Sequence, residues 1–536
     1  MEFVDVKELR FLNRVEWIGS MATGYAIRRN LYLDSVFLMQ VAKRLSEEPG
    51  IEQVAALMGT EKNKRLLVGM GFENTEILSA GPNDLIIALK GKSPSSVNAI
   101  LDNVDAWLLR KPSGLDKSVS RTLDQALVRQ PHANLIVISV PGDYAASEAR
   151  RALERGLNVF MFSSNVPVED ELSLKRYARE RGLIVMGPDC GTAIIAGVGV
   201  GFSNIVRRGP IGVIGAMGTG LQEFTTLVHQ SGSGISHAIG TGSRDLLDAI
   251  GGISTLSALE ALEADPQTEV IALLSKPPGA KTLVLLVERI NLCIKPVVTC
   301  FLGIRKYPSE MDIRFRTTHT LDEAAALATQ MAVGKPAVRT AIGDQELKTL
   351  VARERARMTP EQKYIRGIFA GGTFCYQAQQ VMRDAGLVVH SNAPLDGMPG
   401  LADPLRSVEH TLVDIGADEF TQARPHPMID ATLRRERILA EAQDPQVAVL
   451  LLDFVLGYNA SPDPVGDLLG TIAEAKLTAS QRGGFLSVAA SVCGTERDPQ
   501  HFQEQIRALE EAGVVVLPSS AQAALFSRML ALSLQA

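Results

Sequence analysis

Two short turns rich in glycine and threonine are the features of this sequence whose residue types point most directly to chemistry. Each turn follows an apolar stretch and precedes a helical pattern. Their residues are Gly218, Thr219 and Gly220 in the first turn and Gly371, Gly372 and Thr373 in the second. A strand-to-helix turn of this kind presents backbone N–H groups and the positive end of a helix dipole, and both favour phosphate or carboxylate. Because every α/β fold needs tight strand-to-helix turns, a purely structural role is an equal alternative for each.

The two turns occupy matching places in two segments that look like one unit used twice. Each turn is followed, further along the chain, by an Asp-Pro-Gln motif and a buried strand; these motifs begin at Asp265 and Asp444. The offset grows from 154 residues at the turns to 179 residues at the motifs, which indicates an insertion around residues 392–409. If the two units pair face to face, both helix N-termini would point at one anion.

Two further glycine-containing turns follow predicted strands. The first contains Gly240, Gly242 and Arg244, and the second contains Gly416. The glycines are candidate substrate-binding positions, and the Arg244 guanidinium is a candidate clamp for a carboxylate or acyl group. A surface arginine without a ligand is the alternative interpretation.

Asp189 and Cys190 lie at the end of another predicted strand, where α/β proteins bind ligands. We take both as candidate substrate-binding residues. For the Cys190 thiol, a packing role is the better interpretation, because the sequence shows no partner that would activate it as a nucleophile. His426 lies between two prolines, whose rigidity would suit a positioned general acid or base. A loop-capping role is the alternative for this histidine.

The composition excludes several classes of protein. The 536 residues, 46% of them apolar and 21% charged, fit a soluble protein of roughly three or four domains. A formal charge of −6 and an aromatic content of 5% argue against nucleic-acid binding. Five scattered cysteines without a CxxC pair indicate a reducing compartment, and no apolar run approaches the roughly 20 residues of a membrane span. Without metal-ligand spacing or a Walker A motif, we expect a cytoplasmic protein that binds no metal, membrane or nucleic acid.

The alternation of apolar runs and helical patterns predicts an α/β protein. Continuous apolar runs at 135–139, 158–162 and 183–186, separated by helical patterns, indicate a parallel sheet covered on both faces. We expect a small N-terminal α+β domain, a truncated Rossmann-like domain of the CoA-binding type, and two flavodoxin-like domains. The predicted boundaries are an extension at 1–24, then 25–110, 131–208, 209–334, a charged linker at 335–363, and 364–536.

Several of these motifs carry a resemblance to a known family. Met186-Gly-Pro-Asp-Cys190, the first glycine turn and the segment 263–271 look like the α subunit of succinyl-CoA synthetase. Residues 364–536 look like the ligase domain of its β subunit. The fusion of the two closely resembles the FdrA family, which is acyl-CoA synthetase-like, with hallmarks in Ser275-Lys-Pro-Pro278, in the segment around His426 and in Gly494-Thr-Glu-Arg-Asp-Pro499.

The departures from the synthetase pattern shape the expected function. Synthetases carry a phosphorylated histidine in a loop that corresponds to residues 301–308 of this chain. Residues 301–308 contain no histidine. The glutamate that supports the phosphohistidine aligns with Lys276, and a nucleotide-binding ATP-grasp domain is absent. The glycine-rich CoA loop has no counterpart either. We therefore expect that no cofactor is required, with CoA binding left open.

A site that holds phosphate without passing it to a nucleotide suits an acyl phosphate as direct substrate. The family resemblance links this chain to carbamoyl transfer in allantoin catabolism, in which carbamoyl phosphate and oxamate interconvert with oxalurate and phosphate. It also implies other protein subunits and an oligomer. Lys276 or Arg244 would neutralise developing charge, and His426 would carry a proton. The alternatives are an acyl-CoA ligase that borrows a separate nucleotide-binding chain, and a non-catalytic scaffold that senses an anion.

Overall fold

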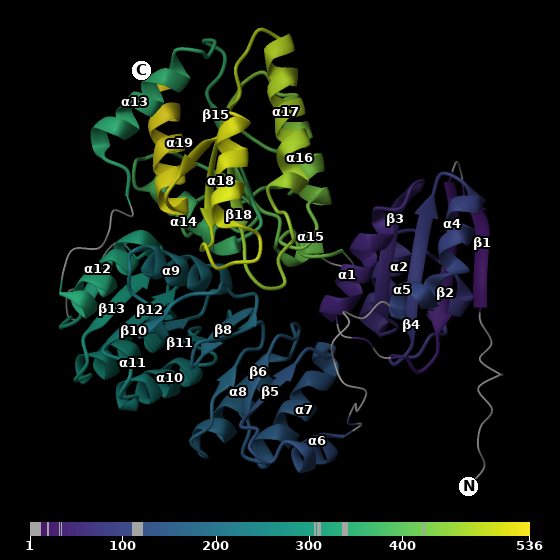
Figure 1. Ribbon diagram of the computed structural model, residues 1–536, viewed down its shortest axis with the longest axis horizontal. Coiled ribbons are helices and arrows are strands. Elements are labelled where there is room, and N and C mark those ends of the chain that lie inside the picture. Colours follow the sequence, from purple (N-terminus) through teal and green to yellow (C-terminus); the bar gives the residue numbers. More distant parts are fainter. Residues whose placement is uncertain are drawn as a thin grey trace. The chain divides into compact units, whose positions relative to one another are not determined.

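The protein forms two compact units, each described here by itself (Figure 1). This computed structural model describes residues 12–18, 21–31, 33, 35–109, 120, 122–304, 307, 312–334, 341–421 and 424–535. The first unit comprises residues 1–129 and 418–430, and the second comprises residues 130–417 and 431–536. Among the helices in the described ranges, none is long and apolar enough to cross a membrane.

The first unit is built on a four-stranded antiparallel sheet in the order β1-β2-β4-β3. Its main elements are β1 (Leu12–Ile18), β2 (Met21–Arg28), α1 (Ser35–Ser46), β3 (Ile51–Met58), α2 (Glu61–Gly69), α3 (Thr75–Leu78), β4 (Leu85–Gly91), α4 (Pro94–Leu101), α5 (Val104–Leu109) and α6 (Leu123–Arg129), and α15 (Asp418–Thr421) belongs to it as well. Helices α1 and α4 pack on one face of the sheet, and α2 and α3 pack on the other. Ser93 caps α4, since its side chain accepts a hydrogen bond from the Ser96 N–H.

The start of this unit differs from the sequence-based expectation. Residues 1–24 were predicted to lie outside the domain, but β1 and the beginning of β2 form an antiparallel hairpin within the sheet. The stretch 93–109 contains two helices, α4 and α5. Periodicity could not separate them because buried Val97, Leu101, Val104 and Leu108 continue across the break.

The second unit begins with a three-stranded parallel sheet in the order β5-β6-β7. Its elements are β5 (Leu135–Ile138), α7 (Gly142–Glu154), β6 (Asn158–Met161), α8 (Val168–Arg179) and β7 (Val185–Met186). This is the expected truncated Rossmann-like unit. Its strands lie where the apolar runs predicted them, within one or two residues at each end.

Two larger sheets complete this unit. The first sheet has the order β14-β13-β12-β10-β11-β8-β9, and its strands β8 and β9 are antiparallel to their neighbours. The second sheet is parallel and has the order β16-β17-β15-β18-β19-β20. The first repeat contains β8 (Thr192–Ile195), β9 (Val198–Gly201), β10 (Arg208–Gly215), α9 (Gly218–Gln230), β11 (Ile235–Gly240), α10 (Ile253–Ala264), β12 (Val270–Ser275), α11 (Ala280–Asn291), β13 (Val297–Phe301), β14 (Arg316–Thr318) and α12 (Leu321–Val333). The second follows α13 (Asp344–Arg355) and contains β15 (Tyr364–Phe369), α14 (Gly372–Arg383), β16 (His390–Ser391), β17 (Thr411–Asp414), α16 (Thr432–Ala442), β18 (Val447–Val455), α17 (Gly466–Gln481), β19 (Ser487–Cys493), α18 (Phe502–Glu511), β20 (Val515–Leu517) and α19 (Ser520–Gln535).

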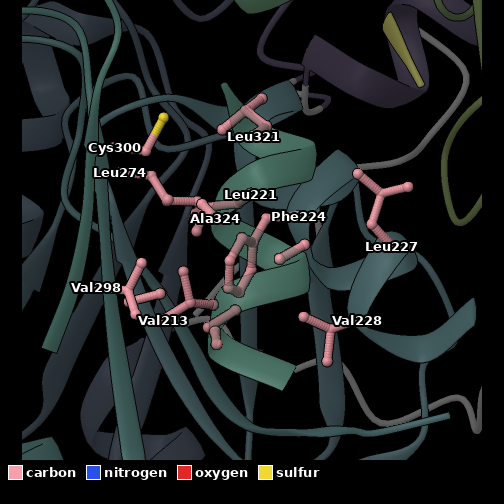
Figure 2. Close-up of a cluster of buried hydrophobic side chains, with 14 of the residues drawn as sticks. Val213, Leu221, Phe224, Leu227, Val228, Leu274, Val298, Cys300, Leu321 and Ala324 are labelled. Carbon is pink, nitrogen blue, oxygen red and sulfur yellow. The ribbon is translucent and has the colours of Figure 1, made fainter. Parts of the chain in front are cut away.

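The sheet orders confirm that the two segments are one unit used twice. The order β14-β13-β12-β10-β11 in the first repeat corresponds to β20-β19-β18-β15-β17 in the second, and both repeats place a glycine turn and a helix after the strand at the same position. Figure 2 shows part of the first repeat's core, in which Phe224 of α9 lies among Val213, Leu221 and Ala324. Each of these side chains is fully buried, so the helix that carries the first turn is held firmly on its sheet.

Reciprocal hydrogen bonds lock the two repeats together. Glu223 of α9 accepts the Ser520 N–H at the start of α19 (2.6 Å), and Gln377 of α14 accepts the Leu321 N–H at the start of α12 (2.8 Å). Glu223 and Gln377 occupy equivalent positions, 154 residues apart. Each repeat thus caps a helix of the other, and this exchange fixes the two glycine turns relative to each other.

Candidate functional site

The first turn connects β10 to α9, and its backbone is open to a ligand. The helix begins at Gly218, and the side chain of the N-cap residue Met217 forms no capping hydrogen bond. A helix leaves its first N–H groups without partners from within the helix, so these donors point out of the N-terminus. Gly218 and Thr219 are partly exposed. The Thr192 hydroxyl oxygen lies beside them, 3.3 Å from where a Cβ on Gly218 would be.

The second turn connects β15 to α14, and the protein's own side chains occupy much of it. The Asp453 carboxylate accepts the N–H groups of Ala370 (2.9 Å) and Gly371 (2.8 Å). Arg434 donates to the same carboxylate at 3.1 Å, and both side chains are buried. On the other side, a Cβ on Gly372 would collide with the Asp414 carboxylate.

The two turns lie against each other across the boundary between the repeats. A Cβ on Gly371 would come within 3.1 Å of Thr219 Cβ, and a Cβ on Gly220 within 3.0 Å of Thr373 Cγ2. The structure therefore brings together all six glycine and threonine positions selected from the sequence. A Cβ on Gly220 would also collide with the Met217 side chain of the same turn, and one on Gly371 with the Phe374 ring, so both positions favour glycine.

Lys276 reaches from the first repeat toward the second. It follows β12, is exposed, and places its ammonium 5.0 Å from the centre of the Tyr376 ring on α14. A cation over an aromatic face is attracted by the electrons of the ring. Among the predicted catalytic residues, Lys276 has the geometry that best suits an anion held between the repeats.

Arg244 is bound within the protein. Its guanidinium donates to the Val166 carbonyl (2.8 Å) and pairs with the buried Glu171 carboxylate (2.9 Å). Glu171 and Asp245 also hold the Lys175 ammonium, at 2.8 and 2.7 Å. These contacts join α8 of the Rossmann-like sheet to the loop after β11, so they give Arg244 a structural role in the described arrangement.

The predicted substrate-binding residues Asp189, Cys190, Gly240 and Gly242 meet, but they pack tightly. A Cβ on Gly240 would collide with the Thr192 carbonyl and lie 2.5 Å from Cys190 Sγ, and one on Gly242 would collide with the Pro188 carbonyl. Burial raises the pKa of the Cys190 thiol to about 12, which keeps it protonated and a poor nucleophile. Asp189 is exposed with a positive φ of 56°. The close approach accounts for both glycines without a ligand.

His426 belongs to the first compact unit, whereas the other predicted site residues belong to the second. Its Nδ1 accepts the Met428 N–H at 3.2 Å, and desolvation lowers its pKa to about 4. The ring is therefore neutral at pH 7. Gly416 is half-buried in the second unit and donates its N–H to Asp414 (2.9 Å).

Sequence reasoning missed the residues that distinguish the two turns. Asp453 interrupts the otherwise apolar strand Val447–Val455, and Arg434 lies in the first turn of α16. A charged residue in a fully buried strand is the signal that could have identified this pair, because such a charge needs a partner. Thr192 carried no comparable signal.

Comparisons with known proteins found family models, a relative over nearly the whole chain, and partial matches. The CoA-ligase family model matches residues 368–530, and the model described as "AllF, heavy metal-associated domain" matches residues 21–125. YahF of Escherichia coli K12, described as uncharacterized, is 43% identical over 516 residues, covering 95% of this chain and 98% of that protein. The succinate–CoA ligase α subunit of Methanothermobacter thermautotrophicus is 27% identical over 158 residues, covering 29% of this chain and about half (53%) of its own length. An apo acetyl-coenzyme A synthetase from Ca. Korarchaeum cryptofilum has 17% identity and a TM-score of 0.32, covering 82% of this chain and 93% of that one.

The fold and the matched models define an acyl-CoA synthetase-like protein with a CoA-ligase domain and a region similar to the succinyl-CoA synthetase α subunit. The chain belongs to the FdrA-like family that includes YahF.

The residues at 21–125 do not fit the metal named in the matched domain model. This stretch contains no cysteine and no histidine, the usual ligands of heavy metals in proteins. Across the described parts of the chain, no group of three or more His, Cys, Asp and Glu side chains could hold a metal ion.

Proposed function

We propose that this chain is a subunit of an acyl-phosphate transferase that holds the phosphate at the N-terminus of α9, with the carbamoyl group as the transferred group. The observation that carries the proposal is the first turn, where α9 begins without a side-chain cap and the Thr192 hydroxyl lies beside Gly218, next to Thr219. The absence of a histidine from 301–308 removes the usual phosphate shuttle, so the phosphate is expected to leave as such.

In the proposed reaction, the amide nitrogen of oxamate attacks the carbonyl carbon of carbamoyl phosphate. A C–N bond forms, the bond from that carbon to the phosphate oxygen breaks, and one proton leaves the attacking nitrogen. The products are oxalurate and phosphate. Because negative charge develops on the phosphate, the α9 N–H groups and the Lys276 ammonium stabilise it more in the transition state than in the substrate.

Lys276 and Arg244 were both proposed from the sequence to neutralise the developing charge, and their contacts favour Lys276 for this role. Arg244 is committed to Glu171 and to the Val166 carbonyl, whereas Lys276 is exposed and lies over Tyr376. Other subunits of a transferase complex would complete the site and accept the proton.

The test is transfer of radiolabel from carbamoyl phosphate to oxamate, with and without partner subunits. Labelled oxalurate should form, and Lys276→Ala should reduce its rate at least tenfold. The exposed Lys348 of α13 supplies a matched control, since Lys348→Ala removes an equal charge far from the turns along the chain. No transfer in any combination of subunits, or equal rates for the two variants, would refute the proposal.

An acyl-CoA ligase with a separate nucleotide-binding chain is the second candidate. The match of residues 368–530 to the CoA-ligase family and the resemblance of the first repeat to a succinate–CoA ligase α subunit favour it. In that case CoA should raise the melting temperature of the purified chain, and acyl-CoA should form from acyl acid, CoA and ATP once the missing chain is added. Carbamoyl transfer without CoA would count against it.

A further inference from the structure

We infer that helix α11 of the first repeat is a docking surface for a second copy of this chain, with the two α11 helices paired antiparallel about a two-fold axis. The surface consists of a stripe of exposed side chains along α11 and of apolar residues beside its two ends. The glycine turns take no part in it, so the inference stands independently of the proposed function.

One side of α11 is packed and the other side is open. Leu283, Leu286 and Ile290 are buried in the core of the first repeat. On the opposite side, the exposed positions are spaced so that they follow one stripe of the helix. These positions are Lys281, Val284, Leu285, Glu288 and Leu292, the last of which directly follows the helix. Most of the stripe is large and apolar, and a contiguous exposed patch of this kind indicates an interaction site.

Further apolar side chains extend the stripe at both ends. At the C-terminal end, Leu292 is 75% exposed and Ile294 is 93% exposed. At the N-terminal end, the Gly279 N–H donates to the Leu246 carbonyl (2.8 Å), which places the neighbouring Leu247 beside the start of α11. Leu247 is exposed as well. Burial of these side chains against a partner would remove apolar surface from water, which favours association.

The second repeat supplies an internal comparison, because its helix α17 occupies the same place. Helix α11 joins β12 to β13, and α17 joins β18 to β19, the corresponding strands of the other sheet. The exposed side of α17 carries mainly small or polar residues, among them Gly470, Ala473, Glu474 and Ser480, together with Leu477. The scaffold therefore does not require an apolar outer face at this place, and the stripe on α11 needs another explanation.

The charges on the stripe select a second copy of the chain as the occupant. Lys281 and Glu288 are exposed, carry opposite charges and lie about two helical turns apart on the same side of α11. The midpoint between them falls between Val284 and Leu285. In an antiparallel pair whose two-fold axis passes there, Lys281 of each copy faces Glu288 of the other, and Val284 faces Leu285. A two-fold interface must be complementary to itself, and this stripe meets that condition.

The same register covers the apolar ends. In an antiparallel pair, the C-terminal end of each α11 lies over the N-terminal end of the other, so Leu292 of one copy approaches Leu247 of the second. Because each copy contributes one helix and one short loop, the interface is smaller than that of a permanent dimer. We therefore expect a dimer that dissociates on dilution.

Sedimentation equilibrium of the full chain over a wide range of concentrations tests the surface. The wild type should form a dimer. Leu285→Glu should raise its dissociation constant at least tenfold, because a charge would be buried against Val284 of the other copy. Leu477→Glu is the matched control, since Leu477 is 57% exposed on α17 and Leu285 is 48% exposed on α11. The control should dimerise like the wild type.

Exchange of the charges tests the antiparallel register. Lys281→Glu and Glu288→Lys should each weaken self-association severalfold, because like charges then face each other twice in every dimer. A mixture of these two single variants should form a mixed dimer, since an acidic stripe then faces a basic one. The double variant Lys281→Glu/Glu288→Lys should dimerise like the wild type. Both positions are exposed, so each variant should fold, which circular dichroism melting checks.

Three results would overturn the inference. The first is a wild type that stays monomeric at every concentration, including one that binds a different protein subunit through Leu285 instead of a second copy. The second is a dimer that Leu285→Glu leaves intact. The third is a dimer that Leu285→Glu dissociates while the mixed single variants fail to associate, because the antiparallel pairing would then be wrong.

Discussion

The turns before α9 and α14 share a backbone plan but differ in the side chains behind them. Leu274 and Gly240 lie behind the first turn, whereas Asp453 and Asp414 lie behind the second. In the second turn the N–H groups of Ala370 and Gly371 bind the Asp453 carboxylate, whereas in the first turn the counterpart of Ala370, Ala216, donates its N–H to the Leu274 backbone carbonyl. The comparison teaches that a duplicated glycine turn does not define a duplicated site, because residues on the neighbouring strands decide what the turn can bind.

The largest expected effect comes from breaking the second turn's internal pair. Asp453→Ala would leave Arg434 charged, buried and unpaired, so the free energy of unfolding should fall by about 3–5 kcal/mol in urea denaturation. The double variant Arg434→Thr/Asp453→Leu should regain most of this loss. A single variant as stable as the wild type would show that the pair does not hold the turn.

At the equivalent positions 223 and 377, only the first repeat should contribute a pH dependence to stability. Burial raises the pKa of Glu223 from 4.5 to about 7, while its counterpart Gln377 cannot titrate. The folded state therefore holds the proton more tightly, and the stability from Glu223 is complete below about pH 4.5 and lost as pH rises through about 7. The effect is at most about 3 kcal/mol. Wild type should lose stability relative to Glu223→Gln across this window, whereas parallel stability curves for the two proteins would contradict the assignment.

The reciprocal caps should contribute a smaller amount. Gln377 is fully buried, and Gln377→Ala would leave the buried Leu321 N–H without its acceptor, at a cost of about 1–3 kcal/mol. The Ser520 hydroxyl would lose the Gln377 amide donor as well. The free energy of unfolding of each protein is measured by urea titration. Equal stability of Gln377→Ala and wild type would mean that the two repeats are not coupled through this residue.

Substitution of Lys276 should have the smallest effect on stability. Its effect on phosphate binding should be large. Its exposed ammonium over Tyr376 should contribute no more than about 1 kcal/mol to folding. Phosphate affinity should nevertheless fall about tenfold in Lys276→Ala, measured by calorimetry, because the ammonium faces the proposed anion. A stability loss without a change in affinity would assign Lys276 to packing instead.

The sequence predicted the architecture well because its signals are local and strong. Buried apolar runs located the strands of the Rossmann-like sheet, and the repeated Asp-Pro-Gln motif exposed the duplication. The residues that meet in space were harder to predict. The turn positions were found from glycine and threonine alone, whereas Asp453 depends on strand register and Arg244 on an ion cluster joined across two sheets. Such partners are set by tertiary packing, which periodicity does not encode.

The most direct test of the central claim, that the α9 turn binds phosphate, is a thermal-shift comparison of wild type, Thr219→Val and Thr373→Val. The ligands are carbamoyl phosphate, inorganic phosphate, CoA and ATP at matched ionic strength. A ligand at about 100 times its Kd stabilises by roughly 2.7 kcal/mol, which raises the melting temperature measurably. We predict stabilisation by carbamoyl phosphate and phosphate that is reduced in Thr219→Val and retained in Thr373→Val. Stabilisation by CoA or ATP alone, or an equal loss in both variants, would contradict the account.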